Sequence, residues 1–113
     1  MTLREMASLL DAEVCTGENR LDEKVEHAFA SDLMSEVLTL GDTPVLITGL
    51  CNIQTIRTCE MAGLEAVIIV RDKQPSEDMI ALAQENDMVI IRCRYSMFRA
   101  CGILYSHGLL PLY

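Results

Sequence analysis

The sequence contains no tryptophan, and aromatic residues make up only 4% of its 113 residues. Lys and Arg are also few: there are 9 of them against 17 Asp and Glu, which gives a formal net charge of −8. Proteins that bind nucleic acid without sequence specificity need a basic surface and aromatic side chains on which bases stack. The scarcity of both predicts that this chain does not bind nucleic acid.

Long hydrophobic runs are missing as well, although half of the residues are hydrophobic. The longest, such as residues 66–70, are far shorter than the roughly 20 residues that a membrane helix requires. The first residues include Arg4 and Glu5 and lead into no continuous apolar segment, so they do not resemble a signal peptide. We therefore predict a cytoplasmic protein without a membrane segment.

No Cys-x-x-Cys pair occurs among the five cysteines, and an odd number of cysteines does not suit a disulfide framework. We expect free thiols in a reducing compartment. His27 and His107 are isolated from each other and from the cysteines. The sequence therefore predicts no metal site, and we expect no cofactor.

What the sequence does contain is one pattern repeated three times: a short β-branched apolar run that leads into an amphipathic helix. The expected strands are 45–48, 66–70 and 88–91, and the expected helices are 52–61, 76–84 and 96–106. Consecutive βα units require a parallel sheet with crossover connections. We predict a single α/β domain with a mainly parallel sheet.

Residues 1–42 have a different character and should form a small N-terminal lobe of helices and strands. Thr2 and Glu5 have the spacing of a capping box, which predicts a helix from residue 3 onward. Residues 12–16 and 24–30 are expected as strands, and 31–38 as a short helix capped by Ser31 or Asp32. The domain would then combine this lobe with the three βα units of residues 43–113.

The last five residues, 109–113, are too apolar to remain exposed to water. They should either fold back onto the core or contact another subunit. We favour the second interpretation, and we therefore predict a homodimer.

Ligands of open parallel sheets bind at the carboxyl ends of the strands, above the N-termini of the following helices. The residues expected at this edge are polar or cationic: Thr48, Gly49, Asn52, Arg71, Lys73, Arg92 and Arg94. They predict a site for an anionic metabolite or nucleotide. The alternative is that the four cations are solvated loop charges that balance the acidic residues of the N-terminal half.

A Cys-x5-Arg pattern occurs twice, from Cys51 to Arg57 and from Cys93 to Arg99. Each begins between an expected strand and an expected helix, where cysteine phosphatases hold a thiolate nucleophile. The loops contain none of the glycines that would turn successive N–H groups inward. A buried structural cysteine is the alternative interpretation of both patterns.

Caps and turns recur in a characteristic order along nearly the whole chain, in the segments 2–6, 16–18, 21–22, 30–38, 47–49, 52–53, 74–77 and 108–109. In this order the chain resembles the stand-alone DRTGG-domain proteins, which are similar to the N-terminal domain of bacterial HPr kinase/phosphorylase. The positions that correspond to the Asp-Arg and Thr-Gly-Gly of the family name are occupied by Cys51-Asn52 and Arg71-Asp72-Lys73.

The resemblance implies a regulatory or ligand-sensing module that is not itself an enzyme. Kinase activity is not expected, because the sequence has no Gly-x-x-x-x-Gly-Lys-Ser/Thr loop. Two other functions stay open at this point. One is a small cysteine-dependent phosphatase-like enzyme, and the other is an interaction subunit whose acidic N-terminal half binds a protein partner.

Overall fold

A six-stranded sheet lies at the centre of the computed structural model, which describes residues 1–113. The sheet has the order β1-β5-β4-β3-β2-β6. β1 pairs antiparallel with β5, and all other neighbours are parallel. This confirms the predicted mainly parallel α/β sheet. The strands are β1 (Glu13–Thr16), β2 (His27–Ala30), β3 (Val45–Thr48), β4 (Ala66–Ile69), β5 (Val89–Arg92) and β6 (Leu110–Pro111).

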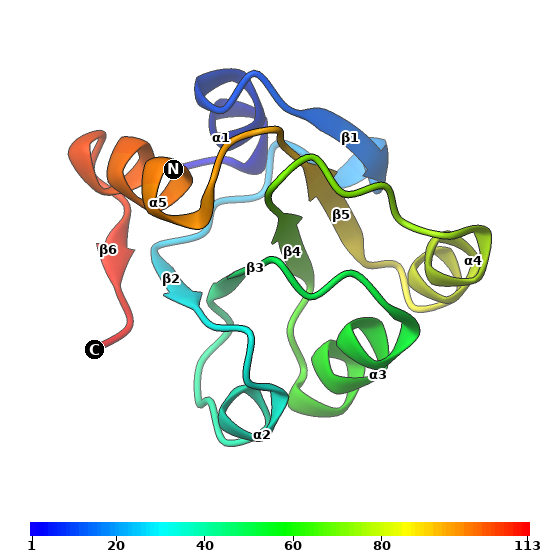
Figure 1. The fold of residues 1–113 in the computed structure, drawn as a ribbon. Coiled ribbons are helices and arrows are strands. Elements are labelled where there is room, and N and C mark those ends of the chain that lie inside the picture. Colours follow the sequence, from blue (N-terminus) through cyan, green and yellow to red (C-terminus); the bar gives the residue numbers. More distant parts are fainter.

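Helices cover both faces of the sheet, so the molecule has three layers (Figure 1). α1 and α5 lie on one face, and α2, α3 and α4 lie on the other. Their bounds are α1 (Leu3–Leu9), α2 (Met34–Val37), α3 (Ile53–Ala62), α4 (Glu77–Glu85) and α5 (Met97–Ser106). None of the five is both long enough and apolar enough to cross a membrane.

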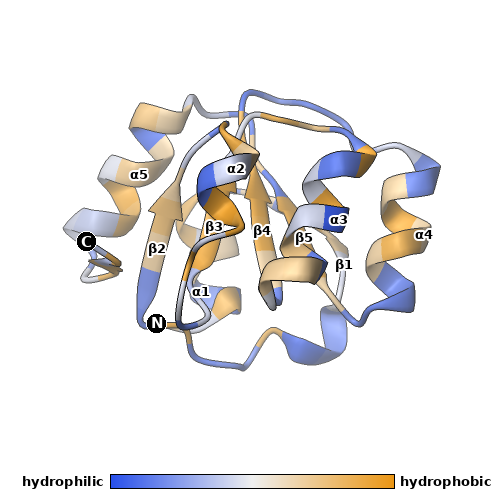
Figure 2. Cartoon of the chain, turned by 90° about the horizontal axis from the view of Figure 1, so that it is seen from below, coloured by the Kyte–Doolittle hydropathy of each residue, from blue (hydrophilic) through white to orange (hydrophobic).

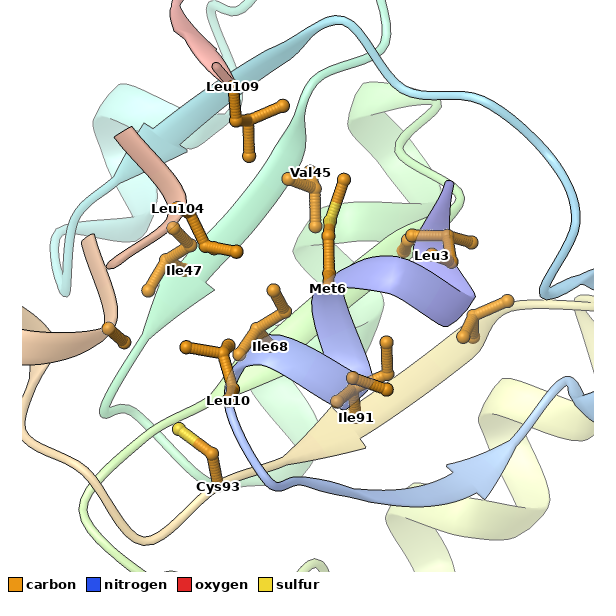
Figure 3. Packing of buried hydrophobic residues seen from close by; sticks show 14 of the residues in the cluster. Leu3, Met6, Leu10, Val45, Ile47, Ile68, Ile91, Cys93, Leu104 and Leu109 are labelled. Atoms are coloured by element: carbon orange, nitrogen blue, oxygen red, sulfur yellow. The ribbon is translucent and has the colours of Figure 1, made fainter. Parts of the chain in front are cut away.

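The central strands are buried on both sides because their residues are apolar in both alternating positions. In β3, Val45 and Ile47 face α1 and α5, while Leu46 faces α3. Figure 2 shows that β3, β4 and β5 are mostly hydrophobic. In Figure 3, Met6 of α1 and Leu10, which caps this helix, lie over this sheet face, and Leu104 of α5 lies close to Ile47. Burial of these side chains supplies most of the driving force for folding.

Residues 1–42, which we expected as a small lobe, belong to the same sheet as the three βα units, and their apolar side chains join the hydrophobic cores on its two faces. The capping box of Thr2 and Glu5 is present at the start of α1, as predicted. β1 extends the sheet beside β5, and β2 lies directly beside β3. The N-terminal segment therefore completes the sheet at both ends of the three βα units.

The helix expected over 31–38 is shorter than predicted, and neither Ser31 nor Asp32 is its N-cap residue. α2 begins at Met34, and Leu33 occupies the N-cap position without a side-chain hydrogen bond. Ser31 instead accepts a hydrogen bond from the N–H of Leu33. Asp32 is not available as a cap because its carboxylate binds the end of β3.

The apolar tail folds back onto its own chain. β6 pairs with β2, and the Tyr113 ring meets Phe29 edge-on at 6.1 Å between centroids. Residues 109–113 therefore fold back onto the core, which was the first of the two alternatives. The homodimer itself stays a prediction.

Candidate functional site

The carboxyl end of β3 carries a small polar cluster centred on Asp32. One carboxylate oxygen of Asp32 accepts hydrogen bonds from the Thr48 hydroxyl at 2.9 Å and from the Gly49 N–H at 2.7 Å. The other oxygen lies 3.7 Å from the Arg71 guanidinium. The Nζ of Lys73 donates to the Gly49 carbonyl at 2.6 Å. We refer to Asp32, Thr48, Gly49, Arg71 and Lys73 as the Asp32 cluster.

This environment lowers the pKa of Asp32. The main cause is the hydrogen bond from the Gly49 N–H, which stabilises the ionised carboxylate. The Thr48 hydroxyl and the positive charges of Arg71 and Lys73 act in the same direction, while partial burial opposes them. Asp32 is therefore a carboxylate at neutral pH, and the groups around it form a binding position for one negative charge.

Arg71 reaches the cluster because of an unusual turn after β4. Arg71 and Asp72 have backbone φ angles of 66° and 58°, in the left-handed region that residues other than glycine rarely adopt. The Arg71 N–H donates to the Tyr95 carbonyl at 2.8 Å, and the Asp72 N–H donates to the Cys93 carbonyl at 3.0 Å. These two bonds hold the turn in place against its backbone strain.

Gly49 lets the Arg71 side chain approach. A Cβ atom added to Gly49 would overlap the Arg71 guanidinium. Any larger residue at this position would therefore push Arg71 away from Asp32. This gives Gly49 a role that depends on the absence of a side chain rather than on its backbone angles.

Arg92 supports the cluster from the side of β5 and β1. Its guanidinium donates to Glu13 at 3.1 Å, to the Asp72 carboxylate at 2.7 Å and to the Lys73 carbonyl at 3.2 Å. The hydrogen bond with Glu13 is the main reason why the pKa of Arg92 is raised. With 17% of its side chain exposed, Arg92 holds the 71–73 turn rather than facing solvent as a free cation.

The last two predicted site residues lie outside the cluster. Arg94 is exposed and pairs with Asp11 at 3.3 Å on the α1–β1 side of the molecule. Asn52 caps α3, where its side-chain oxygen accepts the Thr55 N–H at 3.2 Å. The seven residues are thus not one site: Thr48, Gly49, Arg71 and Lys73 converge, and Arg92 supports them.

Sequence reasoning missed Asp32, which it assigned to the N-cap of a short helix. The structure shows why: β2 is the parallel neighbour of β3, so the residues after β2 end at the same edge as Thr48. A polar pair, Ser31-Asp32, directly follows an expected strand, and this pattern could have indicated a site residue. Because that strand was placed in an N-terminal lobe, its pairing with β3 was not predicted.

The two Cys-x5-Arg patterns do not form activated thiols in this structure. Burial raises the pKa of Cys51, although Lys73 and Arg92 act in the opposite direction, and the Cys51 sulfur contacts the Met79 sulfur at 3.9 Å. Burial also raises the pKa of Cys93, which packs in the core below α1 and α5. Arg99 lies 3.8 Å from the centre of the Tyr95 ring. A thiolate nucleophile needs a lowered pKa, so these surroundings disfavour the phosphatase-like interpretation.

No group of three or more His, Cys, Asp or Glu side chains is placed to hold a metal ion. Taken together, fold and cluster define a small α/β domain in which the Asp32 carboxylate is held by a hydroxyl, a backbone N–H and a guanidinium at the carboxyl ends of parallel strands.

A solved structure with the same fold comes from Clostridium perfringens. It contains the CBS and DRTGG domains of the regulatory region of a pyrophosphatase, in complex with the activator diadenosine tetraphosphate. The TM-score is 0.75 at 20% sequence identity, and the match covers 98% of the present chain. The present chain spans about half of that one, 48% of its length. At this identity the likeness establishes the fold alone. No family model matches the sequence, and no curated protein matches it.

Proposed function

We propose that this chain is a non-catalytic regulatory module of the DRTGG type, which senses an anionic small molecule such as a nucleotide at the Asp32 cluster. The observation that carries the proposal is the convergence of a hydroxyl, a backbone N–H and two cationic side chains on the position of one carboxylate. The same groups suit a phosphate, which is also a hydrogen-bond acceptor with negative charge.

In the proposed complex, a phosphate oxygen takes the place of the Asp32 carboxylate. The Thr48 hydroxyl and the Gly49 N–H donate to it, while Arg71 and Lys73 supply positive charge. Arg92 acts through the 71–73 turn, as a positioning residue. Asn52 and Arg94 take no part, because they serve the α3 cap and the Asp11 ion pair.

Displacement of Asp32 gives this site a way to transmit a signal. Asp32 lies two residues before α2, and α2 packs against the sheet through the buried Val37. A ligand that replaces the carboxylate releases the 31–33 segment and changes how α2 is held. Two states follow, one with Asp32 bound and one with ligand bound, and the ligand shifts their populations by its preference for the second.

The comparison supports this proposal at the level of fold. The Clostridium perfringens structure is a regulatory region bound to a nucleotide activator, and the present sequence resembles DRTGG-domain proteins in its order of caps and turns. Diadenosine tetraphosphate binds that protein; for the present chain, the ligand class we propose is the broader one of phosphate-bearing metabolites.

The test is a thermal-shift titration with inorganic phosphate, AMP, ADP and ATP. We expect a dose-dependent rise in melting temperature for at least one of them, because a ligand that binds only the folded state stabilises it. Arg71→Ala should lower the affinity for that ligand by about 10- to 100-fold. This corresponds to the loss of one hydrogen bond to a charged group, about 1.5–3 kcal/mol. Asp32→Asn should tighten binding, because it removes the competing charge.

Arg4→Ala is the matched control. Arg4 is also an exposed arginine in a surface ion pair, with Asp22 at 2.9 Å, but it lies on α1. Its substitution should leave ligand binding unchanged. A flat titration with all four compounds would refute the proposal, and so would a response that Arg71→Ala does not alter.

A further inference from the structure

One hollow of about 360 Å³ runs along α5 and is almost entirely apolar. It lies on the face of the sheet that α1 and α5 cover, at the end occupied by β2 and β6 (Figure 1). We call it the α5 groove, and its lining residues are Ala28, Ala30, Ile47, Phe98, Cys101, Gly102, Leu104, Tyr105, Leu109, Leu110 and Pro111.

Large apolar side chains stand uncovered around this groove. Phe98 is 90% exposed, Tyr105 is 68% exposed and Leu110 is 56% exposed. Nothing in the chain itself covers these residues. The patch therefore presents both a projecting ring and an apolar hollow, which is the arrangement that a self-complementary interface requires.

Gly102 provides an independent observation. It lies in the interior of α5, where glycine is less favourable than alanine because it loses more backbone freedom on folding. A Cβ added at Gly102 would meet no atom within 4 Å, so the packing of the chain gives no reason for glycine. The close approach of another helix to α5 would explain the glycine, because a missing side chain lets two backbones come near each other.

The distribution of charged residues favours a second copy of this chain as the source of the approaching helix. The chain carries a net charge of −8, yet none of the residues that line the α5 groove is charged. Because like charges repel, two copies of an acidic chain associate most readily through a patch that carries no carboxylates, as this one does. Two of the other hollows, one around Asp11 and Arg92 and one around Glu26 and Asp42, are lined mainly by polar or charged residues.

We propose that two copies of the chain form a dimer by packing α5 against α5 about a twofold axis that passes near Gly102. With the helices antiparallel, Phe98 of each copy lies over the last turn of the other helix and fills the other α5 groove. Leu109, Leu110 and Pro111 form one wall of that groove, so the folded-back tail would also contribute to the proposed interface. The dimer rests on residues separate from the Asp32 cluster, so either proposal can fail alone.

Sedimentation equilibrium over a range of protein concentrations tests the dimer. The wild-type chain should approach twice its mass of 12.6 kDa, and Phe98→Ser should weaken association at least tenfold. Met61→Ser is the matched control, because Met61 is 65% exposed but lies on α3, on the opposite face. A wild-type chain that remains monomeric at every concentration would overturn the proposal, as would a Phe98→Ser variant that associates like the wild type.

Gly102→Ala tests whether the dimer needs a glycine at position 102. In the Phe98→Ser background, at a concentration where that variant is monomeric, Gly102→Ala should raise the melting temperature because alanine is the better helix former. In the otherwise wild-type chain it should weaken dimerisation at least tenfold. If Gly102→Ala leaves the dissociation constant of the dimer unchanged, the α5–α5 contact at Gly102 is refuted.

Discussion

Asp32 is the residue on which the proposed function depends, and its behaviour follows from three neighbours. The Gly49 N–H and the Thr48 hydroxyl bind one of its oxygens, and Arg71 lies beside the other. Because about half of this side chain is exposed, its charge interaction with Arg71 is screened by water and contributes little. The two hydrogen bonds are the stronger contribution, so the carboxylate holds the end of β2 to the end of β3, at the position proposed for a ligand anion.

Asp32→Asn should therefore lower the free energy of unfolding at pH 7 by about 1–2 kcal/mol, because a hydrogen bond to a charged group is worth about 1.5–3 kcal/mol and the Asn amide oxygen still accepts a weaker one. The folded-state pKa of Asp32 is below its ordinary value of 3.8. Its contribution is thus fully present above pH 3.8 and is lost as the pH falls through the lower folded-state value.

Urea unfolding of wild type and Asp32→Asn, at pH 7 and at pH 3 in buffers free of phosphate, measures this. The gap between the two proteins should be smaller at pH 3. An equal gap at both pH values would mean that Asp32 does not contribute as an anion.

Among the elements, β1 is joined to the sheet in an unusual way, and Thr16 is responsible. β1 is the antiparallel edge strand, and its register with β5 shifts between Val14 and Thr16. The buried Thr16 hydroxyl donates to the Met88 carbonyl at 2.7 Å and accepts the Ile90 N–H at 2.9 Å. One side chain thus replaces two ladder hydrogen bonds at the irregularity, and all buried polar side-chain atoms of the protein are satisfied.

Thr16→Val keeps the shape of this side chain but leaves a buried carbonyl and a buried N–H without partners. We expect it to cost about 1–3 kcal/mol of stability. Thr16→Ser keeps the hydroxyl and is the matched control, and it should cost less. Chemical denaturation of the three proteins checks this; a Val variant as stable as the Ser variant would show that the hydroxyl does not fasten β1 to β5.

At the scale of the whole molecule, local structure and the parallel packing of the three βα units were predictable, whereas contacts of residues 1–42 with the rest of the chain were not. The capping box of α1 and the apolar run of β3 depend on residues close together in the sequence, and both were predicted. The pairing of β2 with β3 depends on the order of strands in the sheet, as does that of Arg92 with Glu13, 79 residues away. No local pattern in the sequence encodes that order.

The candidate site divides in the same way. Thr48, Gly49, Arg71 and Lys73 follow expected strands and were predicted as neighbours because carboxyl ends of parallel strands meet at one edge. Asp32 was missed because its position depends on β2 lying beside β3. The engagement of Arg94 by Asp11 was missed because it depends on α1 and β1 lying near the end of β5.

The central claim is that a ligand anion takes the position of the Asp32 carboxylate, and the Gly49 amide reports on that position directly. The decisive measurement is an NMR titration of the ¹⁵N-labelled protein with phosphate and adenine nucleotides. We predict that one of these compounds shifts the Gly49 amide signal saturably, with weaker binding in Arg71→Ala and tighter binding in Asp32→Asn. Saturable binding that leaves the Gly49 signal in place, or no binding by any of the compounds, would contradict the account.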